Sequence, residues 1–199
     1  TTAMLIVEGY KIRNYAEHMT DEELFEFCVM NDGLQIERDA EQNIIIMSPL
    51  SGSSGYFEKD IIFAIETWVR EGNEGVSFSS STGFLLPNGA MRSPDGCWVS
   101  EQRWKTVPEE AKNKFLPIVP DFVVELRSPS DQLIALEEKM REWRINGARL
   151  GWLIDPVDRQ VFIFREDGSV ERIEGLEAVL SGEPVMPGFN FDLKLLRMP

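Results

Sequence analysis

Residues 122–154, FVVELRSPSDQLIALEEKMREWRINGARLGWLI, contain the pattern that decides the fold. The run 122–126 is almost continuously apolar, which is typical of a central strand buried on both faces. Residues 128–145 have apolar side chains at helical spacing, and residues 150–154 form a second apolar run. Because one helix joins the two strands, we expect them to pair in parallel through a right-handed crossover.

Periodicity predicts further elements on both sides of this unit. Thr20 and Glu23 have the spacing of a capping box, which marks the start of a helix. Residues 51–55, rich in Ser and Gly, are expected to form a loop. The remaining predicted elements are helices at 56–71 and just after Pro108, strands at 76–79, 83–86 and 96–99, and hairpins that join 34–38 to 43–47 and 160–165 to 170–173.

The length of 199 residues fits a single domain over residues 1–199, and no internal repeat or linker divides the sequence. The longest apolar stretches, such as 44–47, are far shorter than the ~20 residues that cross a membrane. We therefore expect a cytoplasmic protein without a membrane partner.

The charge balance is acidic along the whole chain. Twenty Lys and Arg residues against 34 Asp and Glu residues give a net charge of −14. Acidic runs such as 37–41 are predicted to be solvated surface. This balance argues against avid, non-specific DNA binding, because proteins that neutralise many phosphates usually have a basic surface.

Scarce residue types exclude several chemistries. Cys28 and Cys97 are the only cysteines and stand far apart, so no CxxC metal site or disulfide framework is indicated. The single histidine, His18, makes a histidine-rich zinc site or a Ser-His-Asp triad improbable. No phosphate-binding loop of the GxGxxG or GxxxxGK[ST] type occurs. Chemistry would therefore depend on carboxylates, Lys, Arg, hydroxyls or a hard metal ion.

Two acidic residues interrupt apolar strands. Glu125 lies inside the central strand, where an unpaired carboxylate costs several kcal/mol, and Asp95 lies just before the strand at 96–99. A hard divalent cation would suit both, and adjacent strands could bring them together. Asp121 is excluded as a partner because four strand residues span roughly 13 Å. The alternatives are an ion pair of Glu125 with a neighbouring Arg or Lys, and an Asx turn for Asp95.

Two cations are expected near these carboxylates. Arg127 follows Glu125 by two positions, so strand alternation puts both side chains on one face. Lys139 falls at the edge of the buried stripe of the following helix, from which its amine could reach the sheet. The alternatives are a simple Arg127–Glu125 ion pair and a boundary lysine that extends toward solvent.

Four segments in order resemble the Uma-two family, which are bacterial restriction endonucleases of the PD-(D/E)XK nuclease superfamily. The segments are Arg92-Ser93-Pro94-Asp95, Pro120 to Ser128, Glu138 to Trp143 and Gly147 to Pro156. The resemblance implies an α/β (α+β) fold with a restriction-endonuclease-like core, a mixed sheet flanked by helices, often as a homodimer. It implies an N-terminal helix and hairpin at about 20–47, a nuclease core at about 54–156 and C-terminal strands at 159–199.

The resemblance also implies functional residues by position. Asp95 and Glu125 match the two acids of the motif, and Lys139 matches a lysine that the family has moved from the strand onto the helix. Glu58 is similar to an acidic residue of the first core helix, with an exposed helix-start glutamate as the alternative. Arg127 occupies the usual strand-lysine position, and arginine cannot act as a base near neutral pH.

The implied activity is Mg²⁺-dependent hydrolysis of DNA phosphodiester bonds, with Mn²⁺ as a substitute ion. Asp95, Glu125 and the backbone carbonyl of Leu126 would hold the metal. Arg92, Arg127, Lys139, Arg141 and Arg144 are expected to concentrate positive charge around this site. The rival hypothesis is a non-catalytic binding or assembly module that retains the fold. An acidic mimic of nucleic acid is a third alternative, and it rests on charge alone.

Overall fold

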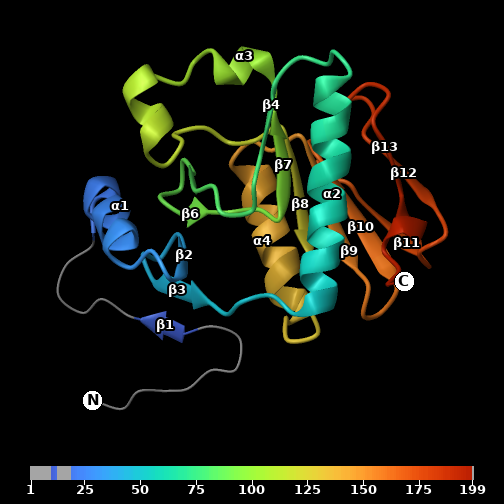
Figure 1. Ribbon diagram of the computed structural model, residues 1–199, viewed down its shortest axis with the longest axis horizontal. Helices are drawn as coiled ribbons and strands as arrows, with labels where there is room; N and C mark the ends of the chain where they lie inside the picture. Colours follow the sequence, from blue (N-terminus) through green and yellow to red (C-terminus); the bar gives the residue numbers. More distant parts are fainter. Residues whose placement is uncertain (1–9, 13–18, 199) are drawn as a thin grey trace. The chain divides into compact units, whose positions relative to one another are not determined.

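The computed structural model describes residues 10–12 and 19–198 (Figure 1). The chain divides into two compact units, which are described separately below. Unit 1 contains the described residues up to Pro49 together with Ser81–Ser93 and Val107–Ile118. Unit 2 contains Leu50–Ser80, Pro94–Thr106 and the described residues from Val119 onward. The single domain over residues 1–199 stays a prediction.

Unit 1 is built on a five-stranded sheet in the order β1-β3-β2-β6-β5. The predicted hairpin is confirmed, since β2 and β3 pair antiparallel with Ile36 opposite Ile46. The predicted capping box is also present, because the Thr20 side chain accepts from the backbone of Glu23 and the Glu23 side chain accepts from Thr20. The elements are β1 (Tyr10–Ile12), α1 (Asp21–Met30), β2 (Gln35–Arg38), β3 (Ile44–Met47), β5 (Phe84–Leu85), β6 (Met91–Arg92) and the 3₁₀ helix η1 (Glu109–Asn113).

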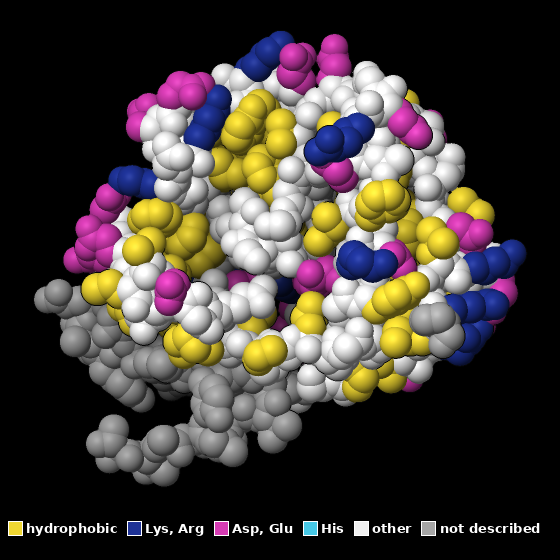
Figure 2. All heavy atoms as spheres, in the orientation of Figure 1, with side chains coloured by type: hydrophobic (Ala, Val, Ile, Leu, Met, Phe, Trp, Pro, Cys, Tyr) yellow, Lys and Arg dark blue, Asp and Glu magenta, His cyan; other side chains and the backbone are white. Residues whose placement is uncertain are grey.

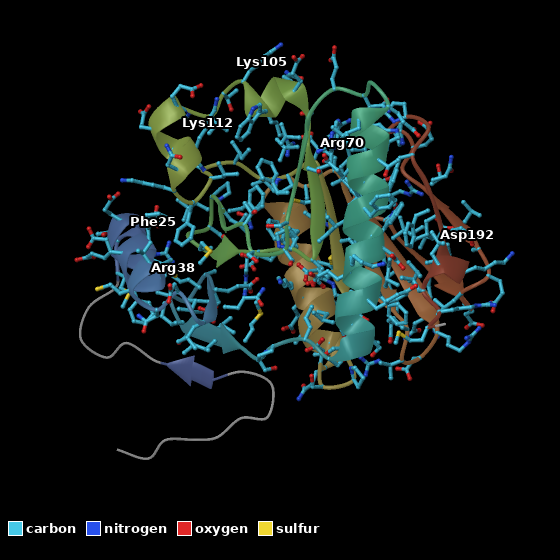
Figure 3. The ribbon with its side chains drawn as sticks, viewed as in Figure 1. Phe25, Arg38, Arg70, Lys105, Lys112 and Asp192 are labelled. Atoms are coloured by element: carbon cyan, nitrogen blue, oxygen red, sulfur yellow. The ribbon has the colours of Figure 1, made fainter. Side chains whose placement is uncertain are left out.

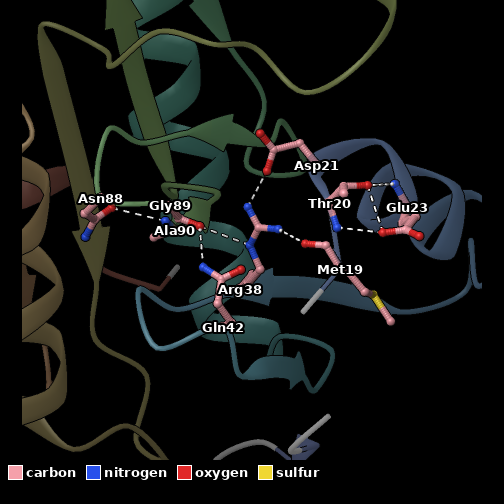
Figure 4. Close-up of polar contacts among 9 residues, drawn as sticks. All are labelled: Met19, Thr20, Asp21, Glu23, Arg38, Gln42, Asn88, Gly89 and Ala90. Atoms are coloured by element: carbon pink, nitrogen blue, oxygen red, sulfur yellow. Dashed lines mark hydrogen bonds and ion pairs between the residues drawn. The ribbon is translucent and has the colours of Figure 1, made fainter. Parts of the chain in front are cut away.

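The first part of the acidic run 37–41 is not a solvated surface, contrary to the prediction, and only Glu41 at its end is exposed. Glu37, Arg38 and Asp39 are only 2%, 3% and 4% exposed. The Arg38 guanidinium donates to the Met19 and Gly89 carbonyls and to the Asp21 carboxylate (Figure 4). Partners distant in sequence compensate the buried charges of Glu37 and Arg38, so the local charge pattern could not reveal their burial.

Unit 2 is built on a six-stranded mixed sheet in the order β11-β10-β9-β8-β7-β4, with a small two-stranded sheet of β12 and β13. The parallel pairing predicted for the two central strands is confirmed, because β8 and β9 pair from Phe122↔Leu150 to Leu126↔Ile154. The elements are α2 (Gly52–Arg70), β4 (Val76–Phe78), β7 (Gly96–Val99), α3 (Glu101–Trp104), β8 (Phe122–Leu126), α4 (Leu133–Ile145), β9 (Leu150–Asp155), β10 (Gln160–Arg165), β11 (Val170–Glu174), β12 (Val179–Ser181), β13 (Asn190–Asp192) and the 3₁₀ helix η2 (Leu193–Leu195).

Helices α2 and α4 cover opposite faces of this sheet (Figure 1). Ile61 and Ile65 of α2 pack with Val124, whereas the adjacent residue Val123 faces the side of α4. Gly151 of β9 permits the close approach of α4, because a Cβ atom there would lie 2.3 Å from Cε of Met140. Alternate residues of β8 therefore pack on opposite faces of the sheet.

Several predicted boundaries were wrong. Residues 52–55 are the first turn of α2 rather than a loop, because the Ser51 hydroxyl caps the helix by accepting from the Ser54 backbone. Helix α4 begins at Leu133 rather than near residue 128, since the Asp131 carboxylate holds Ser128 in a turn. Ser and Gly favour loops and helix caps equally, so composition alone could not separate these outcomes.

Among the described residues, none of the helices combines the length and the apolar character needed to cross a membrane.

Candidate functional site

The strand register of unit 2 brings Asp95 and Glu125 together. Gly96 of β7 lies opposite Val124 of β8. Because the two strands are antiparallel, the next pair in the register is Asp95, which precedes Gly96, and Glu125, which follows Val124. The Asp95 carboxylate accepts a hydrogen bond from the backbone N–H of Leu126 at 2.6 Å. This contact fixes Asp95 against the end of β8, directly beside the buried carboxylate.

Helix α4 supplies two donors to the Glu125 carboxylate, which is only 2% exposed. Lys139 Nζ lies 3.0 Å from Oε2, and the indole Nε1 of Trp143 lies 2.9 Å from Oε1. The ion pair that sequence analysis left open for Glu125 is therefore formed with Lys139. Lys139 reaches back over the sheet, as its position on the edge of the buried stripe indicated.

Burial raises the pKa of Asp95 well above its usual value, and the Glu125 carboxylate nearby raises it further. Lys139 and the Leu126 N–H oppose this shift, whereas Glu58 on α2 adds to it. Burial likewise raises the pKa of Glu58, against the effect of a 2.7 Å hydrogen bond from the Ser80 hydroxyl. Glu58 is half-buried, so it is not the exposed helix-start residue that was its alternative.

The structure does not place Arg127 against Glu125. Its guanidinium donates to the carboxylates of Asp155, at 2.9 Å, and Asp158, at 2.6 Å. Strand β8 ends at Leu126, and the register that pairs Leu126 with Ile154 puts Arg127 next to Asp155 at the end of β9. The prediction that Arg127 lies beside Glu125 was wrong, because the neighbouring strand offers Arg127 the fully buried carboxylate of Asp155.

We expect Arg127→Met to lower the free energy of unfolding by about 3 kcal/mol, since it leaves the buried Asp155 carboxylate without its cation. Burial disfavours the charge on Asp155, yet hydrogen bonds from Gln160, Asp158 and Arg127 outweigh it and hold the pKa below its usual value. A carboxylate with a lowered pKa stabilises the protein above its unfolded-state pKa, and this stabilisation is lost in acid. The loss in free energy of unfolding caused by Arg127→Met should therefore become smaller as the pH falls into the range of acid unfolding.

Chemical denaturation at several pH values measures this effect. Arg141→Met is the matched control, because Arg141 is half-exposed and pairs with Glu137 one turn away on α4. Exposed pairs of this kind contribute at most about 0.5 kcal/mol. Equal losses in the two variants would contradict a structural role for Arg127 at the strand ends.

The oxygen atoms of this cluster suit a hard divalent cation. Asp95 interacts electrostatically with two other carboxylates, Glu125 and Glu58, and with the ammonium group of Lys139. Residual negative charge in a partly buried site favours cation binding. Within residues 10–12 and 19–198, no three His, Cys, Asp or Glu side chains form a metal-binding group. A metal would therefore need two carboxylates, the Leu126 carbonyl and water.

The basic residues expected to concentrate positive charge are largely compensated by acidic partners. Arg92 pairs with Glu37 in unit 1, while Arg127, Lys139 and Arg141 pair with carboxylates in unit 2. Figure 2 shows Lys and Arg side chains lying beside Asp and Glu side chains over the visible face. Three residues labelled in Figure 3 illustrate the same local pairing: Arg70 with Glu66, Lys105 with Glu101 and Lys112 with Glu109.

Asp121 and Cys97 are two further reactive groups of unit 2. Asp121 is held by Ser100 and Arg103, so its exclusion agrees with the structure. Burial raises the pKa of the Cys97 thiol, which keeps it protonated. His18 lies outside the described residues. Sequence analysis missed the polar role of Trp143, which it named only as the end of the segment Glu138 to Trp143. The signal available in the sequence was that Trp143 follows Lys139 by four residues, which puts both side chains on one face of the helix.

Comparisons with known proteins identify a matching family and a similar fold. A family model named Uma2, described as "Putative restriction endonuclease", matches residues 21–195. A crystal structure titled as a "putative nuclease belonging to DUF820" from Anabaena variabilis superposes with a TM-score of 0.68 at 20% sequence identity, covering 81% of this chain and 88% of that one. No curated protein matches the chain. The mixed α/β fold with a restriction-endonuclease-like core is confirmed.

Proposed function

Since the chain belongs to the Uma2 family, described as "Putative restriction endonuclease", we propose that it is a metal-dependent endonuclease that hydrolyses DNA phosphodiester bonds. The observation that carries this proposal is the pairing of Asp95 with Glu125 at neighbouring strand ends, with Lys139 on the Glu125 carboxylate. The homodimer and the cytoplasmic location implied by the sequence are part of the same proposal.

Each residue of the cluster has a distinct task in this mechanism. Asp95, Glu125 and the Leu126 carbonyl would hold Mg²⁺, or Mn²⁺ in its place, through hard oxygen donors. When bound, the ion supplies a water of lowered pKa and offsets negative charge on the phosphate. Lys139 would orient that water or stabilise developing charge, and Glu58 would bind through water or complete a second site. Arg127 supports the strand ends, because its guanidinium is paired with Asp155 and Asp158.

Calorimetric titration with Mn²⁺ tests the metal site. The wild type should bind one ion, whereas Asp95→Ala and Glu125→Ala should bind at least about 10-fold more weakly, because each variant loses one of two carboxylate ligands. Asp167→Ala is the control, since this exposed carboxylate lies in the turn between β10 and β11. Equal affinity in wild type, Asp95→Ala and Glu125→Ala would contradict the assignment.

A non-catalytic binding or assembly module that retains the nuclease fold is the second candidate function. The observation in its favour is the pairing of Arg92, Arg127 and Arg141 with carboxylates, in a chain of net charge −14. These pairs reduce the positive charge that would attract a polyanionic substrate. Metal binding without cleavage of any DNA form would favour this candidate over the nuclease.

A further inference from the structure

The Glu125 carboxylate is held by two donors of different character. Lys139 and Trp143 lie four residues apart on α4, so they share one face of the helix. Each contacts a different oxygen, with Lys139 on Oε2 and Trp143 on Oε1. Trp143 has no exposed surface, and Glu125 is 2% exposed, so this hydrogen bond is shielded from water.

The indole donor differs from the ammonium in what it can do to the carboxylate. An ammonium is a point charge on a long flexible chain, and it can follow the carboxylate as it moves. The Trp143 ring is fixed by packing, so its N–H defines one direction for Oε1. Because an ionised carboxylate has about four acceptor sites, these two bonds do not by themselves prevent it from binding a metal ion.

We propose that Trp143 is a positioning residue for the metal ligand Glu125. Its hydrogen bond sets the plane of the carboxylate before a divalent cation binds, and it does so without neutralising the charge that attracts the cation. The inference rests on the proposed function, because it takes Glu125 as a metal ligand. Hydrogen-bond partners of metal ligands typically change metal affinity about 10- to 100-fold when they are removed.

The chain contains a matched control for this role. Trp152 on β9 is 1% exposed, and its indole nitrogen has no hydrogen-bond partner within the part of the chain that the structure describes. Its ring packs on the opposite face of the sheet, against Phe122 and Phe189. Trp143→Phe and Trp152→Phe therefore remove the same atoms from similarly buried sites, but the first alone breaks a contact with Glu125.

The experiment is calorimetric titration of the two variants and the wild type with Mn²⁺. We expect Trp143→Phe to bind about 10- to 100-fold more weakly and Trp152→Phe to match the wild type. If Trp143→Phe fails to fold, benzothienylalanine at position 143 keeps the ring shape and removes only the N–H. Wild-type affinity in either 143 variant would overturn this inference alone, whereas a wild type that binds no Mn²⁺ would overturn the proposed metal site and this inference with it.

Discussion

Asp95→Asn is expected to stabilise the metal-free protein by about 1 kcal/mol, the size of a typical single stabilising substitution, and to remove its stabilisation by Mn²⁺. The neutral amide avoids the repulsion that burial and the Glu125 and Glu58 carboxylates impose on Asp95. Its oxygen can still accept from the Leu126 N–H, so the strand contact is retained. Metal binding stabilises a folded protein by mass action, and the variant offers the cation a neutral amide oxygen in place of a carboxylate.

Thermal unfolding with and without Mn²⁺ measures both effects. Burial and neighbouring carboxylates raise the pKa of Asp95 above its unfolded value, so ionisation costs the wild type stability as the pH rises through that folded pKa. The advantage of Asp95→Asn should therefore be small in acid and grow as the pH rises through the folded pKa of Asp95. Asp121→Asn is the matched control and should destabilise the protein, because Asp121 is ion-paired with Arg103. A destabilised Asp95→Asn would show that Asp95 is a structural residue.

Lys139→Met should lower the stability of the metal-free protein by about 3 kcal/mol, because it leaves the Glu125 carboxylate buried without a cation. Glu125→Gln should cost less, since Lys139 is 13% exposed and can extend toward water. The double variant removes both charges and should recover most of the stability lost in Lys139→Met.

A double-mutant cycle by urea denaturation measures this coupling. The control pair is Arg141 with Glu137, which lies on the same helix but is more exposed and should couple by about 0.5 kcal/mol at most. Coupling between Glu125 and Lys139 no larger than in this control would contradict a buried ion pair at the centre of the site.

The sequence predicted the elements in which one strong local signal was sufficient. The apolar run 122–126 and the helix that follows it led directly to the parallel pair of β8 and β9. The position of Asp95 directly before a strand led to the prediction that it could meet Glu125 across adjacent strands, and the register of β7 and β8 brings the two residues together. The helical angle of Lys139 indicated that its amine could reach the sheet, and the resemblance to the family named the same residue.

The features that the sequence did not reveal depend on partners distant along the chain. Glu37 is buried because Arg92 and the Ser93 N–H, 55 and 56 positions away, compensate its charge. Arg127 turned to Asp155 because the end of β9 lies beside the end of β8. Alternation along one strand describes a face of the sheet, but it does not show which neighbouring strand supplies the stronger partner.

Cleavage of DNA in the presence of Mg²⁺ or Mn²⁺ is the most direct test of the central claim. Wild type, Asp95→Asn and the exposed-site control Asp167→Asn should be assayed on supercoiled, linear duplex and single-stranded DNA, with and without a chelator. We predict metal-dependent cleavage by wild type and Asp167→Asn, and a loss of at least about 100-fold in Asp95→Asn. Cleavage that persists in Asp95→Asn, or its absence from the wild type on all DNA forms, would contradict a nuclease built on Asp95 and Glu125.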